Sequence, residues 1–340
     1  MDWEPKEKSS AHGPTSALEV HGLSVSYCLG TGVSVPAIVD VSFDLRSGEI
    51  LGIVGESGAG KTTLATSLLN LLPLAGVIEQ GRVLLAGNDI LAASPRELDA
   101  IRGRHISLIP QEPSIALHPT MRICDQVEKI LAAHAYGSQS ARRARRHDLF
   151  SWLFGKDAAR ISSSYPHQLS GGQQQRSLIA MALACEPHVV IADEPTASLD
   201  PETRTEILYL FDSLRTLFDL AVILITHSPA LLAGLADRVL VLYAGRVAEI
   251  GPTGAVLSKP LHPYTRALLR CSLPTLGSNK ISHRAKLHVI PGESPRPGPD
   301  LPGCQFEPRC AERLVICRSR EPVPVFAGLG HSVSCFHYCE

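Results

Sequence analysis

The 340-residue sequence lacks the features that mark several broad classes of protein. It contains no stretch of about 18 uninterrupted apolar residues, and polar residues and a proline interrupt the longest candidate, residues 64–78, so we predict no membrane-spanning helix. The charged residues 1–8 include no apolar segment of the kind that a secretory signal needs. The formal net charge of −1 predicts no general attraction to nucleic acid or to acidic membranes. The sequence also has no internal repeat and no low-complexity tract.

The residues that are present are typical of a globular protein. A hydrophobic content of 44% and a charged content of 19% predict a sizeable core, and the length favours two domains. Alternating residues within 17–50 predict a small antiparallel sheet, and residues 120–165 lack strand-like runs and predict helices. Residues 239–247 predict a hairpin with a glycine turn. Residues 291–303, rich in proline and glycine, predict a linker or a wrapped loop.

A phosphate-binding motif is the strongest local signal. Residues 55–62, Gly-Glu-Ser-Gly-Ala-Gly-Lys-Thr, match G-x-x-x-x-G-K-[ST] at every fixed position. The apolar residues 50–54 predict a strand before it and residues 63–69 predict a helix after it, which is the context that the motif requires. We expect Lys61 to reach the β- and γ-phosphates and Thr62 to bind Mg²⁺. The alternative, a purely structural glycine turn, fits this context poorly.

Two acidic residues end a second apolar segment. Residues 189–193, Val-Val-Ile-Ala-Asp, predict a buried parallel strand with a carboxylate at the end where open α/β sheets bind ligands. We expect Asp193 to face Mg²⁺ and Glu194 to polarise an attacking water as general base. On their own these acids would be better interpreted as a cap for the turn at Pro195, but the phosphate-binding loop upstream favours catalysis.

Two more predicted strands end in polar side chains. Residues 221–226 are followed by His227. Its neutral imidazole could form hydrogen bonds to a γ-phosphate and to a water, although a lone histidine more often has a structural role. Residues 106–110 precede Gln111, whose amide could bind a metal and orient water, which by itself is a weak signal. A second glycine-rich element, residues 169–173, precedes Asp193 in the sequence and suggests a nucleotide held between two copies of such a domain.

Taken together, these motifs resemble the ATPase subunits of ABC transporters over roughly residues 17–258, in the family's order. The resemblance matches Walker A to residues 55–62, Walker B to 189–193, the signature to 169–173, the Q-loop to Gln111, the D-loop to 198–200 and the switch histidine to His227. It implies an α/β fold: a P-loop NTPase (ABC ATPase) core with an antiparallel β subdomain and a helical insert. The expected parts are a flexible tail at 1–16, the ATPase domain at 17–258 with its insert at about 112–170, and an irregular, Cys-rich C-terminal extension at 259–340.

The resemblance also implies a head-to-tail dimer in which Walker A of one chain and the signature of the other clamp each ATP. Ser170, Gly172 and Gln173 would then face the partner's γ-phosphate, and Tyr27 would stack on adenine. Catalysis is assigned to Glu194, His227 and Lys61, and Mg²⁺ to Thr62, Gln111 and Asp193. The expected nucleotide contacts are Tyr27, Gly55, Glu56, Ser57, Gly58, Ala59, Gly60, Lys61, Thr62, Thr63, Gln111, Ser170, Gly171, Gly172, Gln173 and Asp200.

Five of the nine cysteines crowd residues 301–340. The reducing compartment of a P-loop ATPase argues against disulfides, so a metal site is the better interpretation. The first four of these cysteines are separated by 5, 6 and 17 residues, not by the C-x₂₋₄-C spacing that is usual in structural zinc sites, and four thiolates can hold an iron–sulfur cluster. Resemblance to importers with a C-terminal [4Fe–4S] site implies Cys304, Cys310, Cys317 and Cys335 as ligands and Cys339 as a spare thiol; zinc or free thiols are the alternatives. We expect the scattered Cys28, Cys124, Cys185 and Cys271 to be buried.

Three segments, residues 110–119, 165–172 and 262–268, are similar to the oligopeptide, dipeptide and nickel importers. Pro110 and His118 depart from that pattern and bear on the partner rather than on ATP chemistry. The resemblance implies the ATP-hydrolysing subunit of a bacterial importer, most directly for oligopeptides or dipeptides. It would be a peripheral protein at the cytoplasmic face of the plasma (inner) membrane. The partners would be two transmembrane permease subunits, a second ATPase subunit and, indirectly, an extracytoplasmic substrate-binding protein. The resemblance favours a paralogue as the second ATPase, with a copy of this chain as the alternative.

In that arrangement the helical insert docks on the membrane subunit. We interpret its cluster of Arg142, Arg143, Arg145 and Arg146 as a solvated helix face, with contact to lipid headgroups or to a permease as the alternative. Three other functions stay open: an importer for nickel or another small solute, a non-transport soluble ABC ATPase that acts on ribosomes or DNA, and a non-catalytic iron–sulfur regulator. Because the charge is balanced, we expect no nucleic-acid partner.

Overall fold

The computed structural model describes residues 16–28, 30, 32–272, 288–293, 301–328 and 330–339. Most of the predicted tail and residues 294–300 of the proline-rich segment lie outside these ranges. Contacts divide the chain into two compact units that alternate along the sequence. Unit 1 comprises residues 1–18, 45–49 and 92–223, and unit 2 comprises residues 19–44, 50–91 and 224–340. The predicted boundary after residue 258 falls inside unit 2, and each unit is described by itself.

The strand before the phosphate-binding motif organises unit 2. This strand, β3 (Ile50–Val54), is buried along its whole length, as expected for an all-apolar strand in a parallel pairing. It pairs in parallel with β9 (Arg238–Tyr243), and β9 pairs antiparallel with β10 (Arg246–Pro252). Ala244 and Gly245 turn this hairpin with positive φ angles of 48° and 76°, which match the twist of the flanking strands. The predicted hairpin is therefore confirmed.

The C-terminal extension is more regular than predicted. After β10, two helices follow, α9 (Thr253–Ser258) and α10 (Pro263–Ser272). Farther along, β12 (His331–Val333) pairs with β10, and β11 (Val325–Gly328) pairs with β12. The expectation of an irregular extension is wrong at its end, which adds two strands to the sheet that contains β3. These strands are too short to show an alternating pattern in the sequence.

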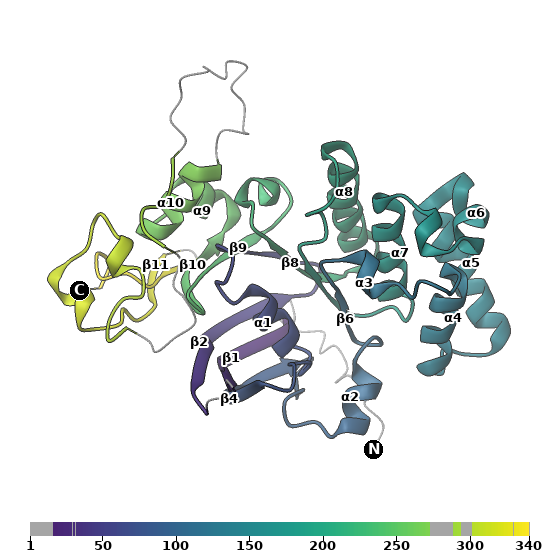
Figure 1. Ribbon diagram of the computed structural model, residues 1–340, viewed down its shortest axis with the longest axis horizontal. Helices are drawn as coiled ribbons and strands as arrows, with labels where there is room; N and C mark the ends of the chain where they lie inside the picture. The colour runs from purple at the N-terminus through teal and green to yellow at the C-terminus, as the bar shows by residue number, and fades with distance from the viewer. Residues whose placement is uncertain are drawn as a thin grey trace, which may run out of the picture. The chain divides into compact units, whose positions relative to one another are not determined.

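A second, four-stranded sheet lies in the N-terminal part of the chain (Figure 1); strands were predicted there within residues 17–50, and two of the four lie beyond that range. Its order is β2-β1-β4-β5, and β4 and β5 are antiparallel. The strands are β1 (Ser16–Cys28), β2 (Ser34–Arg46), β4 (Gly76–Leu85) and β5 (Asn88–Asp89). The helix after the phosphate-binding loop is α1 (Lys61–Ser67).

Unit 1 combines two parallel strands with a group of helices. The strands β6 (Ile106–Ile109) and β7 (Val189–Asp193) pair in parallel, and β8 (Ala221–Thr226), which has residues in both units, is fully buried. All three were predicted. Figure 1 shows α4 to α7 gathered together, which confirms helices in residues 120–165. The helices are α2 (Pro95–Ile101), α3 (Pro113–Ala116), α4 (Ile123–Ala133), α5 (Gln139–Phe154), α6 (Ala158–Ser163), α7 (Gly171–Leu183) and α8 (Pro201–Phe218).

Short 3₁₀ turns join some of these elements, and none of the helices in the described ranges combines the length and the apolar character that crossing a bilayer requires. The turns are Gly155–Asp157, Pro166–Gln168, Pro229–Leu232, Glu307–Arg309 and Val315–Arg318.

The arginine cluster of α5 is not simply a solvated face. Arg142 and Arg146 pair with Glu128 of α4 at 2.9 and 3.4 Å. The guanidinium of Arg145 donates to the carbonyls of Leu183 and Ala184 at the end of α7, where cations complement unpaired helix carbonyls. Of the four arginines, Arg143 is exposed and the other three are partly buried. The cluster therefore holds the helices of the insert together, which corrects the expectation of a solvated face.

Next to β6 lies a histidine whose protonation disfavours folding. The ring of His105 stacks on that of His188 with centroids 5.7 Å apart. Burial, together with the neighbouring His188, Arg104 and His134, lowers the pKa of His105 to about 4. This folded-state value lies below the unfolded value of about 6.5. The unfolded chain therefore binds an extra proton between these two values, and stability falls as the pH falls through that window.

We expect the melting temperature to decrease between about pH 7.5 and about pH 5, and His105→Gln to reduce that decrease by about 2–4 °C. The corresponding free energy of unfolding is on the order of 1 kcal/mol, after discounting for solvent at a half-buried ring. Thermal unfolding followed by circular dichroism checks this, with the exposed His147→Gln as the matched control. An identical pH dependence in all three proteins would contradict the assignment.

Candidate nucleotide site

The phosphate-binding loop of unit 2 needs its glycines for two different reasons. A Cβ on Gly55 would lie 2.3 Å from the carbonyl oxygen of Leu242 in β9, so the loop approaches the hairpin too closely for any side chain. Gly60 has a φ of 100°, and a Cβ there would lie 2.6 Å from the carbonyl oxygen of Ala37. Gly58 also has a positive φ, of 80°, but nothing lies within 4 Å of its Cβ position. Alternating left-handed residues of this kind turn successive N–H groups toward one side, which can bind an anion.

Lys61 lies folded into this loop. Its side chain is buried, with the residue only 7% exposed, and its Nζ donates to the carbonyl oxygens of Gly55 and Glu56 at 2.9 and 3.0 Å. A buried ammonium on neutral carbonyls is a site where phosphate oxygens can replace weaker acceptors. Thr62 is exposed on the first turn of α1, and the Tyr27 hydroxyl is 3.2 Å from Oγ1 of Thr63. The loop residues and Tyr27 are therefore brought together in unit 2.

Two residues of the C-terminal extension hold Glu56 of the loop, and the sequence analysis assigned neither of them a role. The backbone N–H of Glu56 donates to the Tyr264 hydroxyl of α10 at 2.9 Å. Its carboxylate accepts two hydrogen bonds from the guanidinium of Arg309, at 2.7 and 3.0 Å. Arg309 lies between Cys304 and Cys310, and Tyr264 lies in the His-Pro-Tyr segment, but nothing local in the sequence connects either residue to position 56.

In unit 1 the two acids lie at the end of β7 as predicted, Asp193 as its last residue and Glu194 directly after it. Asp193 is buried at the end of the strand, and Glu194 has a positive φ of 47°, a backbone strain that is most often retained at functional positions. The amide Nε2 of Gln111, after β6, is 3.4 Å from Oε2 of Glu194. The structure therefore brings Gln111 to the proposed base, which the sequence suggested only weakly.

The signature residues form the start of α7. Ser170 is the N-cap: its Oγ accepts the N–H of Gln173 at 3.4 Å, and Oε1 of Gln173 accepts the N–H of Ser170 at 3.2 Å. This reciprocal capping box fixes both side chains. Gly171 is exposed. Close packing requires a glycine at position 172, because a Cβ there would lie 2.4 Å from Cγ2 of Thr203 in α8.

The remaining predicted residues lie at element ends. Asp200 is the N-cap of α8 and accepts the N–H of Thr203 at 3.0 Å; this backbone hydrogen bond lowers its pKa. Ser57 is exposed in the loop of unit 2, Ala59 is buried there, and His227 is exposed directly after β8. Unit 2 therefore holds Walker A, Tyr27 and His227, and unit 1 holds Gln111, Asp193, Glu194, the signature and Asp200.

The four cysteines predicted as ligands lie near one another in unit 2. Burial, together with the neighbouring Cys317, Cys310 and Cys335, raises the pKa of the Cys304 thiol to about 11. The backbone N–H of Leu314 donates to the sulfur of Cys317 at 3.4 Å. The neighbouring backbone N–H groups of Phe306, Glu312 and His337 oppose the upward pKa shifts of Cys304, Cys310 and Cys335.

This donor set suits a metal cluster in its chemistry, because hydrogen bonds to sulfur stabilise bound thiolates. As they stand, however, no set of three or more His, Cys, Asp or Glu side chains in the described part of the chain has the arrangement of a metal site. Cys339 differs from the four, since its Sγ is 3.5 Å from the carbonyl oxygen of Cys335.

Burial was predicted for the four scattered cysteines, and that prediction is correct for Cys185 only. Cys28 is exposed at the end of β1, and Cys124 and Cys271 are partly exposed.

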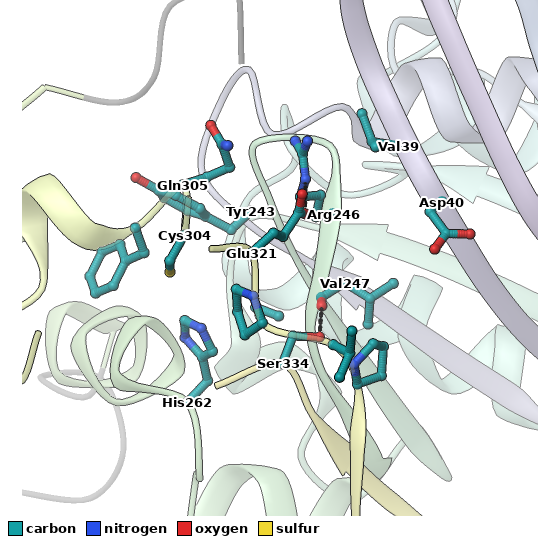
Figure 2. Close-up of a pocket in the computed structure, with 15 residues that line it drawn as sticks. Val39, Asp40, Tyr243, Arg246, Val247, His262, Cys304, Gln305, Glu321 and Ser334 are labelled. Atoms are coloured by element: carbon teal, nitrogen blue, oxygen red, sulfur yellow. Dashed lines mark hydrogen bonds and ion pairs between the residues drawn. The ribbon is translucent and has the colours of Figure 1, made fainter. Parts of the chain in front are cut away.

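Next to Cys304 of the C-terminal cluster, the extension packs on the β9–β10 hairpin around a pocket of about 260 Å³. Figure 2 shows Cys304 and Gln305 beside Tyr243, and Arg246 beside Glu321, with which it forms an ion pair. Ser334 Oγ donates to the carbonyl of Val247 at 2.8 Å. His262 also lines the pocket, and burial lowers its pKa to about 3. These contacts join the Cys-bearing segment to the hairpin that also touches the phosphate-binding loop.

Comparison with known proteins gives a consistent result. Residues 38–197 match the ABC transporter family, and residues 248–317 match the C-terminal region of oligopeptide/dipeptide transporters. The chain is 41% identical to the dipeptide transport ATP-binding protein DppD of Bacillus subtilis, over 94% of each chain. It is 39% identical to the oligopeptide transport ATP-binding protein OppD of Salmonella typhimurium, over 95% of this chain and 94% of the relative.

A solved dimeric structure of the bacterial ABC transporter cassette MJ0796 is 28% identical. It superposes with a TM-score of 0.62 and covers 69% of this chain and 98% of the cassette. The predicted P-loop ABC ATPase fold is thereby confirmed. By its motifs, its fold and its similarity over nearly the whole length, the chain belongs to the ABC transporter ATP-binding proteins of the oligopeptide/dipeptide importer type.

Proposed function

We propose that this chain binds and hydrolyses ATP to drive the import of oligopeptides or dipeptides through a membrane permease. The observation that carries the proposal is the phosphate-binding loop with Lys61 folded into it, in a chain 41% identical to a dipeptide transport protein over 94% of its length. The matched C-terminal region, residues 248–317, favours peptides over nickel or another small solute.

The chemistry assigns a separate task to each polar group. Loop N–H groups and Lys61 bind the β- and γ-phosphates, and Tyr27 stacks on the adenine. The hydroxyl of Thr62, the amide oxygen of Gln111 and the carboxylate of Asp193 are the oxygen donors that Mg²⁺ prefers, and the bound ion would neutralise phosphate charge. Glu194 accepts the proton of the attacking water, and His227 holds the γ-phosphate and that water. Ser170, Gly171, Gly172, Gln173 and Asp200 would complete the site of a partner ATPase.

The partner arrangement follows from the same proposal. We expect two permease subunits, a paralogous ATPase that pairs with this chain, and a substrate-binding protein that acts through the permease. The chain would lie on the cytoplasmic face of the plasma membrane. Supporting this, two relatives are named as dipeptide and oligopeptide transport ATP-binding proteins, and a similar cassette has been solved as a dimer.

Uptake and co-purification test this function. Cells that lack the chain should regain uptake of labelled di- and tripeptides when the chain is restored, and should not regain it with Lys61→Ala. The tagged chain should co-purify with permease subunits. Restored nickel uptake without peptide uptake would show that the transported substrate is nickel and not peptides. Co-purification with ribosomes or nucleic acid and without a permease would replace the transport function altogether.

We further propose that Cys304, Cys310, Cys317 and Cys335 hold a [4Fe–4S] cluster, which would act as a structural clip. Support comes from the backbone N–H of Cys304, which donates to the carbonyl of Cys317 at 2.8 Å, and from the N–H of Leu314, which lies on the sulfur of Cys317 at 3.4 Å. Chain purified without oxygen should contain about four iron and four sulfide per molecule. Cys317→Ser should lose both, and the matched Cys339→Ser should keep them. Stoichiometric zinc with no iron or sulfide would contradict the proposal.

A further inference from the structure

Arg309 of the C-terminal extension uses all three nitrogens of its guanidinium in hydrogen bonds, two of them to the phosphate-binding loop. The guanidinium of Arg309 donates to both carboxylate oxygens of Glu56, its Nε donates to the carbonyl of Pro291 at 2.9 Å, and its Nη1 is 3.4 Å from the Tyr243 hydroxyl. The Arg309 side chain is 6% exposed and that of Glu56 is 21% exposed. A buried, bidentate ion pair of this kind fixes the geometry of both side chains.

The Arg309–Glu56 ion pair packs beside a cluster of aromatic rings that come from both the sheet and the extension. The rings of Tyr243 and Tyr264 lie 4.5 Å apart between centroids, and both contact Phe306, at 5.2 and 5.5 Å. The guanidinium carbon of Arg309 lies 5.9 Å from the Tyr243 ring centroid, a distance at which a cation is attracted to the ring. Because Tyr264 also accepts the N–H of Glu56, the extension holds both the backbone and the side chain of this residue.

The position of Glu56 makes its charge important for binding. Glu56 is the second residue of a loop that must accept a polyanion, and a carboxylate there repels phosphate unless a cation neutralises it. Arg309 supplies that cation at contact distance. Removing the guanidinium would take this cation away from a partly buried carboxylate beside the phosphate site. The free-energy cost of removing one partner of a buried ion pair is far larger than the stabilisation that a surface ion pair contributes.

We propose that Arg309 is a positioning residue for nucleotide binding: it neutralises Glu56 and fixes the second residue of the loop, so that the C-terminal extension sets the affinity for ATP. The inference rests on the proposed ATP-binding role of residues 55–62. It assigns the extension a task in the ATPase cycle that does not depend on whether the neighbouring cysteines hold a cluster.

The test measures binding of a fluorescent ATP analogue with Mg²⁺ to the full chain. Arg309→Met should weaken binding about tenfold and raise KM for ATP more than it lowers kcat. The double variant Glu56→Gln with Arg309→Met should return to within about threefold of the parent, because it also removes the negative charge that Arg309 offsets. Arg318→Met is the matched control, since Arg318 also pairs with a glutamate of the extension, Glu307, at 3.1 Å but is 70% exposed; its binding should equal the parent's.

A purely structural role predicts a different pattern. If the double variant binds as weakly as Arg309→Met, or if Arg309→Met binds as tightly as Arg318→Met, the proposal is wrong. If Arg309→Met does not fold, Glu56→Gln alone decides: the remaining cation should tighten binding about threefold, and weaker binding would overturn the inference. Failure of the proposed function looks different again, because then the parent and Lys61→Ala would both show no saturable binding.

Discussion

Glu194→Gln is expected to lower ATP turnover by about 10²–10⁴-fold while MgATP still binds with parental affinity. An amide of the same size cannot accept the proton of the attacking water, but it can still hydrogen-bond to the Gln111 amide, which lies 3.4 Å from the native carboxylate. The measurement is phosphate release at saturating ATP, together with equilibrium nucleotide binding.

A matched control for this variant is Glu206→Gln. Glu206 is an exposed acid of α8 that pairs with Arg176 at 2.7 Å, so its loss should leave turnover within about twofold of the parent. Full turnover by Glu194→Gln would remove Glu194 from the role of general base. Loss of nucleotide binding would instead show that the strained turn after β7 needs the carboxylate for its structure.

Lys61→Ala is expected to weaken MgATP binding by about 100-fold and to abolish measurable hydrolysis, because it removes the ammonium at the phosphate position. The structure places this ammonium inside the loop, on the carbonyls of Gly55 and Glu56, rather than on the surface. Titration with a fluorescent nucleotide checks the affinity. The exposed Lys129→Ala of α4 is the matched control, with unchanged binding expected. Parental affinity in Lys61→Ala would refute the interpretation of residues 55–62 as a nucleotide site.

Much of the core could be predicted from sequence because its signals are local. β3 is apolar throughout and β7 is apolar up to Asp193, and each leads into a motif. Both are buried, and each has a parallel neighbour, β9 for β3 and β6 for β7. The β9–β10 hairpin follows from a turn at Gly245 between apolar runs. The helices of residues 120–165 follow from the lack of strand-like runs. In each case the residues that fix the element lie within a few positions of one another.

Contacts between distant residues could not be predicted. Arg309 and Glu56 are 253 positions apart, and no periodicity or motif links them. The strands β11 and β12 are four and three residues long, too short to show an alternating pattern. The arginines of α5 looked solvated because their partners, Glu128 and the end of α7, come from other helices. In these places tertiary packing, and not local preference, decides the structure.

The central claim is that two ATPase protomers bind MgATP between them, each contributing Ser170 to the other's site. The most direct test is the mass of the Glu194→Gln variant by light scattering with MgATP, alone and with its paralogous ATPase. We predict a particle of about twice the 36.5 kDa of one chain that forms only with nucleotide and is lost in Ser170→Arg. A single-chain mass in every condition, with nucleotide bound, would contradict the account.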